Sequence, residues 1–221
     1  MQIRKRLPAL LFRLAAFAGF LTALIFYMTA LGPSWRSLSL FSIQVGMAMA
    51  VVLAFEVLFN AIDMRHGLRG MPAGFYMPFK LPLMSFCIIA MAAFFFDTVL
   101  YYPIEATAQG IIYHAVLGIV PLIDYLFFDE KGTVKWYDCL SAMLYPIIYL
   151  SFVWTRPLIW PDATLYNGPS GMFPYPILNP ANEFFWVGSI VLFLLVAAFL
   201  VGMSFFNDFL AGKFRKRDTV I

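Results

Sequence analysis

Three side chains able to form a hydrolytic centre are predicted to lie at one depth in a membrane. Ser42 lies near the start of an inward-running apolar segment, and His114 lies at nearly the same depth in a second one. Asp97 comes just before the end of an outward-running segment. At a helical rise of about 1.5 Å per residue, these groups lie roughly 5–7 Å below the outer surface. Together they offer a hydroxyl nucleophile, a base and a carboxylate that could orient the base.

The sequence also predicts which way Ser42 faces. Ser42, Gly46, Ala50 and Ala54 recur every four residues, and such a stripe of small side chains lets a neighbouring helix approach closely. Ser42 is therefore predicted to face protein rather than lipid. Structural roles stay open beside the catalytic ones, because a serine in a membrane helix often bonds the carbonyl one turn earlier and a buried histidine can simply pack.

The composition defines the elements that must position these residues. The chain has 221 residues, of which 62% are hydrophobic and only 12% charged, against about 25% charged residues in a soluble domain. Apolar stretches long enough to cross a bilayer recur at 8–31, 39–61, 81–101, 110–128, 137–155 and 184–206. The sequence therefore predicts an all-α, polytopic integral membrane bundle of about six transmembrane helices, forming a single domain over residues 1–221.

Basic residues predict the orientation of this bundle. Arg13 lies within a span, and only Arg36 and Arg156 flank one side of the membrane. The opposite side receives all the others: Arg4, Lys5, Arg6, Arg65, Arg69, Lys80, Lys131, Lys135, Lys213, Arg215, Lys216 and Arg217. The positive-inside rule then places both termini in the cytoplasm, with the cytoplasmic membrane as the location if the chain is bacterial. Residues 156–183, rich in proline and aromatic side chains, become one long exported loop.

Charged groups inside the spans need partners of their own. Arg13, Glu56 and Asp124 all fall in the inner half of the bilayer, where mutual neutralisation explains them more simply than chemistry does. They are predicted to be structural. At the outer rim, Asp97 could pair with an arginine instead of orienting a base.

A polar stripe is predicted on one face of the fifth span. It consists of Asp138, Ser141, Tyr145, Tyr149 and Arg156. Side chains at this spacing share a helical face, so the stripe should line an interior or a cavity.

Cofactor chemistry and nucleic-acid binding find no support in the residue pattern. His66, the other histidine, falls in a cytoplasmic loop, which argues against a haem held by two histidines of this chain. No cluster has zinc spacing, no glycine-rich phosphate loop occurs, and no metal site is predicted. The basic residues occupy short turns rather than one exposed face, so nucleic acid is not an expected partner.

Several short motifs resemble, in the same order along the chain, those of the androgen-induced gene one family of membrane hydrolases and its bacterial six-span relatives. The motifs are Phe41-Ser42-Ile43-Gln44-Val45-Gly46, His114 with Asp124 and Leu126-Phe127-Phe128, Tyr145-Pro146 with Tyr149 and Arg156, and Pro174-Tyr175-Pro176-Ile177-Leu178. This chain departs from the pattern at three positions. Ser42 replaces a threonine, Gly46 an asparagine, and Gly118 a frequent proline.

The resemblance implies a hydrolase of fatty-acid esters of hydroxy fatty acids, without a cofactor. Its nucleophile falls on Ser42 and its essential histidine on His114, the two residues that depth alone places in one layer. From depth and helical face rather than from the resemblance, Asp97 is expected to hold the imidazole, and Tyr149 with Arg156 to receive a fatty-acid carboxylate at the water edge. Gln44 and Tyr145 are expected to support the site.

Two other classes of function stay open. A non-catalytic protein that binds lipid or another small molecule would use the same pocket without a contact between Ser42 and His114. A transporter would need a polar path through the inner half as well, so Glu56 and Asp124 would have to line water instead of pairing with Arg13. Membrane lipids are expected partners in every case.

Overall fold

The computed structural model describes residues 5–31, 35–67, 72–100, 107–159, 173, 175, 178–181 and 183–218. Within these residues all regular secondary structure is helical. The helices are α1 (Arg6–Leu31), α2 (Trp35–Leu38), α3 (Phe41–Arg65), α4 (Met77–Leu100), α5 (Ala108–Phe128), α6 (Trp136–Ser141), α7 (Leu144–Ile159) and α8 (Phe185–Asp218). In the described part of the chain, six helical segments are long and apolar enough to cross a membrane, with α6 and α7 together forming one of them. The predicted six-span helical bundle is thus confirmed at this level.

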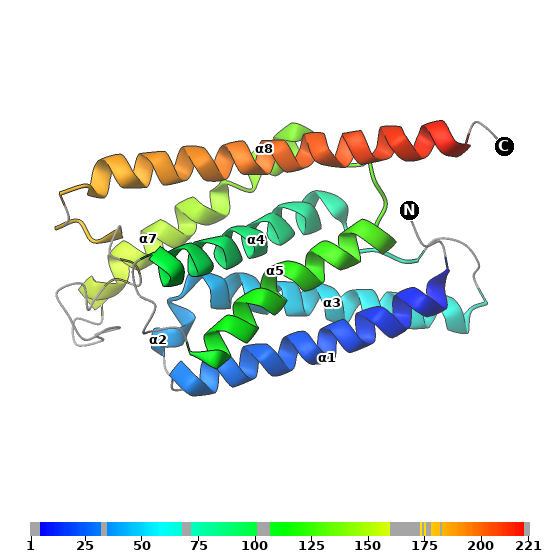
Figure 1. Ribbon diagram of the computed structural model, residues 1–221, viewed down its shortest axis with the longest axis horizontal. Coiled ribbons are helices and arrows are strands. Elements are labelled where there is room, and N and C mark those ends of the chain that lie inside the picture. Colours follow the sequence, from blue (N-terminus) through cyan, green and yellow to red (C-terminus); the bar gives the residue numbers. More distant parts are fainter. Residues whose placement is uncertain are drawn as a thin grey trace.

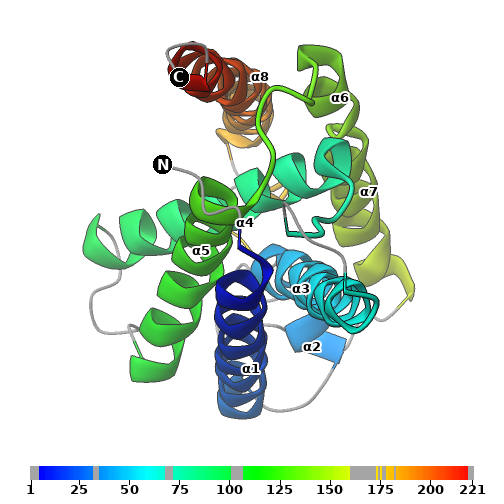
Figure 2. The same ribbon diagram turned by 90° about the vertical axis from the view of Figure 1, so that its right-hand side faces the viewer.

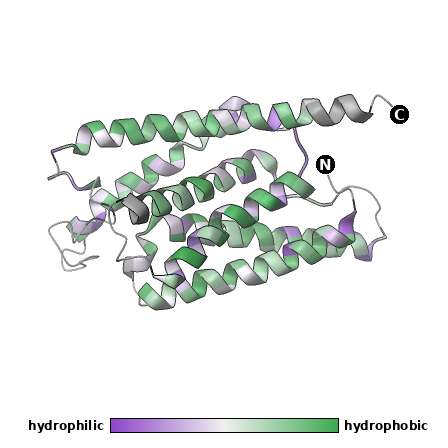
Figure 3. Cartoon of the chain, in the orientation of Figure 1, coloured by the Kyte–Doolittle hydropathy of each residue, from purple (hydrophilic) through white to green (hydrophobic). Residues whose placement is uncertain are grey.

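The long helices run side by side, and α1 begins at the same end of the bundle at which α8 ends (Figure 1). Figure 3 shows hydrophobic residues along most of each long helix and hydrophilic ones gathered mainly towards the two ends of the bundle. This distribution fits a bilayer, because lipid cannot satisfy polar side chains in the middle of a span.

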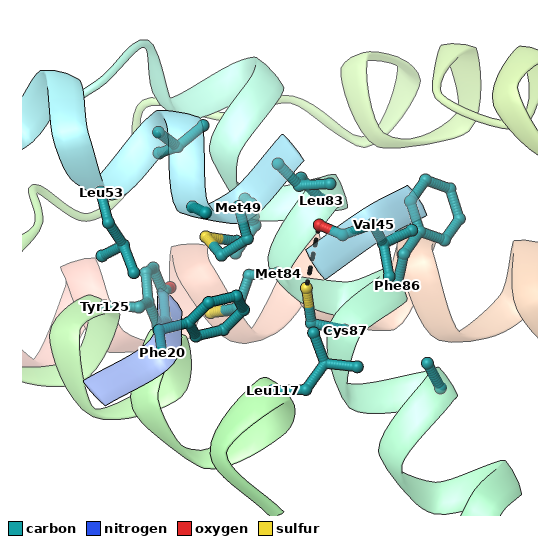
Figure 4. Close-up of a cluster of buried hydrophobic side chains, with 14 of the residues drawn as sticks. Phe20, Val45, Met49, Leu53, Leu83, Met84, Phe86, Cys87, Leu117 and Tyr125 are labelled. Atoms are coloured by element: carbon teal, nitrogen blue, oxygen red, sulfur yellow. Dashed lines mark hydrogen bonds between the residues drawn. The ribbon is translucent and has the colours of Figure 1, made fainter. Parts of the chain in front are cut away.

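The core forms where α1, α3, α4 and α5 pack together. Val45, Met49 and Leu53 of α3 meet Met84 and Cys87 of α4 in this core (Figure 4). The Cys87 thiol lies 4.0 Å from the Val45 carbonyl oxygen, and both Cys87 and Cys139 are free, buried cysteines.

Gly118 lets α4 and α5 approach each other closely. A Cβ at this position would lie 2.9 Å from the Cβ of Met91, which is tighter than real Cβ contacts allow. The absence of a side chain at Gly118 is therefore explained by the Met91 side chain that packs over it.

The helix α8 lies at the edge of the bundle, as Figure 2 shows from the end. It packs against α4 and α6 and is the least buried of the six spanning segments. Large apolar side chains such as Trp186, Leu194 and Phe205 are more than half exposed along it. In a bilayer this surface faces acyl chains, which are as apolar as the side chains themselves.

The fifth spanning segment is not one continuous helix. A turn at 142–143 separates α6 from α7, and Pro146 lies in the first turn of α7. Proline lacks the N–H that would bond the Ala142 carbonyl in a continuous helix, and Tyr145 N–H donates to that carbonyl instead, at 3.0 Å. The predicted single stripe is therefore wrong at the end that holds Asp138 and Ser141. Ser141 is exposed and bonds back to Asp138, whereas Tyr149 and Arg156 of α7 are buried.

Candidate functional site

Ser42 is the second residue of α3, at the end of the bundle opposite to the start of α1. Its side chain is only 4% exposed, and Gly46 and Ala50 below it are buried as well, so the predicted facing towards protein is confirmed. Leu40 occupies the N-cap and its side chain caps none of the first N–H groups of the helix. The first turn of a helix leaves such N–H groups without partners in the helix itself, so this turn presents hydrogen-bond donors next to a hydroxyl group.

Side chains of α7 hold the segment that leads into α3. The Tyr149 hydroxyl donates to the Ser39 carbonyl at 2.9 Å, and the Tyr145 hydroxyl donates to Gln44 Oε1 at 3.0 Å. The Gln44 amide in turn donates to the Leu38 carbonyl at 2.8 Å. Three of the five residues predicted to assist Ser42 and His114, namely Gln44, Tyr145 and Tyr149, are thus brought together around one turn, where they fix the backbone on either side of Ser42.

Tyr113 of α5 fixes the same turn from the opposite side. Its hydroxyl donates to the Ser42 carbonyl at 2.6 Å, and the residue is fully buried. A Cβ at Gly46 would lie 3.2 Å from Tyr113 Cζ and would overlap the hydroxyl oxygen. The phenol therefore occupies the space that an asparagine would need at position 46.

His114 follows Tyr113 and is 3% exposed. Its Nδ1 lies 2.8 Å from the Gly110 carbonyl, which can only accept a hydrogen bond. In the neutral ring the proton therefore sits on Nδ1, and Nε2 carries the lone pair that a general base needs. The ring stacks on Phe94, with centroids 3.9 Å apart and planes 2° from parallel, and meets Tyr27 edge-on. These contacts hold the imidazole in one orientation.

Ser42 and His114 are thus both buried and lie on helices that the Tyr113 hydrogen bond joins. Between these two described residues there is no direct hydrogen bond. Arg156 is buried near the end of α7, at 3% exposure. The side chain of Asp97 lies outside the described residues, so its predicted role stays a prediction.

A second polar centre lies at the opposite end of the bundle. The Arg13 guanidinium of α1 donates to Asp124 of α5 at 2.7 Å and to Asp129, just after α5, at 2.8 Å. It also lies 3.5 Å from Glu56 of α3. All four side chains are fully buried. The three charges predicted to neutralise one another therefore lie together, and Asp129 joins them.

Lys80 completes this charge cluster, which we define as Arg13, Glu56, Lys80, Asp124 and Asp129. Its ammonium lies 2.6 Å from Glu56 and from Asp129, and it also pairs with Asp124. The sequence pattern assigns Lys80 to a loop, whereas α4 already begins at Met77 and the side chain is 1% exposed. One feature of the sequence could have indicated a second cation. Arg13 alone cannot neutralise the two buried carboxylates predicted beside it.

The charge cluster also anchors the loop that precedes α4. Glu56 accepts a hydrogen bond from Phe75 N–H at 3.0 Å, and Arg13 donates to the Ala73 carbonyl. Asn60 donates to the same carbonyl at 2.8 Å and accepts from Ala73 N–H at 3.0 Å. The loop backbone is therefore bonded to two helices before α4 begins.

Three carboxylates of the charge cluster are spaced as ligands of a metal ion would be. Oxygens of Glu56, Asp124 and Asp129 lie within 4.8 Å of one another. The Lys80 ammonium contacts all three, so it already provides the positive charge that a cation would supply there. These residues thus form an internal ion cluster rather than an open metal site.

Lys131, in the loop after α5, gives a pH-dependent prediction. Its ammonium donates to the carbonyls of Tyr125 and Asp129 and lies 4.0 Å above the Tyr125 ring. Burial lowers its pKa from 10.5 to about 8. The charged groups facing it are Asp129 and Asp124, which oppose this shift, and Lys80 and Arg13, which reinforce it.

Between about pH 8 and pH 10.5, Lys131 is protonated in the unfolded chain but not in the folded chain. The contribution of Lys131 to the free energy of unfolding should therefore rise with pH across that window. We expect the thermal midpoint of the native protein, relative to a Lys131→Met variant, to increase between about pH 8 and about pH 10 in detergent. A difference that stays constant with pH would contradict the assignment.

Comparisons of the chain with protein-family models, with curated proteins and with solved structures gave no match. Within the described residues, the fold is a helical bundle in which six segments are long and apolar enough to cross a membrane.

Proposed function

We propose that this chain is an integral membrane hydrolase of lipid esters, with Ser42 as nucleophile and His114 as general base. The observation that carries the proposal is the Nδ1 contact of His114 with the Gly110 carbonyl, at 2.8 Å. This contact leaves Nε2 as the basic nitrogen of a buried imidazole on the helix next to Ser42.

The first turn of α3 supplies the remaining chemistry. Ser42 Oγ attacks the ester carbonyl while His114 Nε2 takes the hydroxyl proton. Negative charge then develops on the carbonyl oxygen, and N–H groups at the start of α3 stabilise it as an oxyanion hole does. The bond to the alcohol breaks, and the alcohol leaves with the proton from His114. Water activated by the same histidine then releases the fatty acid from Ser42.

This mechanism requires Ser42 and His114 to approach each other when substrate binds. Catalytic hydrogen bonds are often long in the absence of substrate and tighten in the complex. Tyr113 connects the two helices through the Ser42 carbonyl at 2.6 Å, which holds the turn that carries Ser42 against the helix that carries His114. Arg156 is proposed to bind a carboxylate of the substrate or product, and Asp97 to orient the histidine.

The remaining proposals concern the orientation of the protein in the bilayer and the routes by which substrate and water reach Ser42. The termini are proposed to be cytoplasmic, which places Ser42 near the outer surface and the charge cluster near the inner one. A lipid ester would then reach Ser42 sideways between helices, and water would arrive from the outer face. Pairing of Glu56 and Asp124 with Arg13 and Lys80 favours a structural role for the inner half over a transport path.

One observation favours a second function. The absence of a hydrogen bond between Ser42 and His114 is what a non-catalytic lipid-binding protein would show. The two proposals differ in a direct assay of ester hydrolysis.

We expect the purified protein in detergent to hydrolyse a fluorogenic long-chain acyl ester and to leave the matching acetyl ester largely intact. A long acyl chain buries apolar surface at about 0.8 kcal/mol per CH₂, whereas an acetyl group gains little from a site reached through lipid. Fluorescence release across a series of chain lengths tests this. Failure to hydrolyse any ester in the series would favour the lipid-binding function.

A further inference from the structure

A pocket of about 440 Å³ lies at the end of the bundle where the charge cluster lies, opposite to the end that holds Ser42. One wall is the segment that leads into α4, and the other is the loop between α5 and α6. The lining residues are Phe75, Tyr76, Met77, Pro78, Glu130, Thr133, Lys135, Tyr137 and Asp138. The pocket therefore lies where two spans end, at the level at which lipid headgroups meet the protein.

Buried charges hold both walls in place. Phe75 of the first wall donates its N–H to Glu56. The second wall is bonded through Asp129, which pairs with Arg13 at 2.8 Å and with Lys80 at 2.6 Å. Because the same ion cluster fixes both segments, the pocket between them is preorganised rather than a chance gap between loops.

The polar groups of the pocket carry both signs of charge. Lys135 is an exposed cation, and its ammonium lies 5.3 Å from the centre of the Tyr137 ring. Glu130 is an exposed carboxylate, and Asp138 is a half-buried one whose Oδ2 accepts the Lys135 N–H at 2.9 Å, so Oδ1 is the oxygen that would bind a ligand. The hydroxyl of Thr133 adds a neutral donor. A ligand that satisfies all of these groups has to present an anionic oxygen and a hydrogen-bonding cation.

Aromatic side chains surround this polar patch. Tyr76 is 71% exposed and Tyr137 47%, and neighbouring Trp136 is 53% exposed. Tyrosine and tryptophan gather at the membrane–water boundary, where a ring can contact acyl chains while its polar end stays wet. The same rings also offer faces to a ligand cation.

We propose that this pocket binds a phosphoethanolamine group, and that a phosphatidylethanolamine of the adjacent leaflet supplies it. Lys135 and Thr133 bind the phosphate oxygens, and Glu130 with Asp138 accepts hydrogen bonds from the primary ammonium. Phosphatidylglycerol lacks the cation and would place a phosphate beside two carboxylates. Phosphatidylcholine has a cation that cannot donate hydrogen bonds, so it would satisfy the aromatic rings but not the carboxylates.

The test uses the full-length protein in detergent, with dioleoyl phosphatidylethanolamine, phosphatidylcholine and phosphatidylglycerol added separately and binding followed by native mass spectrometry. We expect phosphatidylethanolamine to bind about tenfold more tightly than either of the others, as one or two charge-assisted hydrogen bonds would give. Lys135→Gln and Glu130→Gln should each reduce this preference to near unity.

Matched controls make the same charge changes at exposed positions outside the pocket, Lys5→Gln and Glu183→Gln, and should keep the preference. Soluble glycerophosphoethanolamine distinguishes the two possible sources of the group. Much weaker binding of it than of the lipid supports a lipid headgroup, whereas equal binding supports a soluble ligand with the same chemistry. Equal affinity for all three lipids, or an unchanged preference in both pocket variants, would overturn the proposal.

Discussion

Replacing Arg13 with methionine is expected to destabilise this protein by about 3–5 kcal/mol. The substitution keeps the side chain long and apolar but leaves Glu56, Asp124 and Asp129 with Lys80 as their only cation in the cluster. Removing one partner from a buried ion network exposes the others to the full cost of an unpaired charge in a medium of low dielectric constant. The loop that Arg13 and Glu56 anchor before α4 should loosen with it.

The matched control is Arg6→Met. Arg6 lies on the same helix and pairs with Asp63, but its side chain is 14% exposed and that of Asp63 27%, so this pair is less buried than the charge cluster. Partly exposed ion pairs contribute about 0–1 kcal/mol. The measurement is the unfolding midpoint of each variant in the same detergent. Equal midpoints for the two variants would show that the charge cluster does not stabilise the fold.

Turnover of a long-chain ester should fall by a factor of about 10²–10⁴ when either Ser42 or His114 is replaced by alanine. Loss of the Ser42 hydroxyl removes the nucleophile, and loss of the imidazole leaves the hydroxyl without a base. Ser42→Thr should keep part of the activity, because a hydroxyl remains at the start of α3.

Ser85→Ala is the control for Ser42→Ala. Ser85 is a fully buried serine of α4 whose hydroxyl bonds the Leu81 carbonyl at 2.8 Å, one turn earlier in its own helix. Its replacement removes a buried hydroxyl of the same kind but one with no proposed chemistry, so full activity is expected. Undiminished turnover in the Ser42 and His114 variants, with unfolding midpoints unchanged, would rule out the proposed mechanism.

The number of spans could be predicted from sequence because hydropathy needs no tertiary information. The boundary of α4 could not, because a lysine at a span end looks like a loop charge until its partners are known. Lys80 lies inside the first turn of α4 because Glu56, Asp124 and Asp129, from α3 and the end of α5, converge on it. Partners so distant in sequence leave no local pattern.

The candidate site, too, could be predicted from sequence only in part. The depth of Ser42 and His114 in a membrane stays a prediction from counting residues along apolar segments, whereas the structure shows both buried on helices that a hydrogen bond of Tyr113 joins. The role of Tyr113 itself was not predicted, because an aromatic residue in an apolar helix usually indicates a packing role. Only its contact with the Ser42 carbonyl, and the space that Gly46 leaves for it, reveal that it fixes the turn.

The central claim is that Ser42 is an activated nucleophile, and covalent labelling tests it most directly. An alkyl fluorophosphonate forms a phosphorus–oxygen bond with an activated serine and releases fluoride, which leaves an adduct that mass spectrometry can locate. The account predicts a single adduct on Ser42, absent from Ser42→Ala and formed far more slowly by His114→Ala. No adduct on Ser42, or one that forms equally fast without His114, would contradict it.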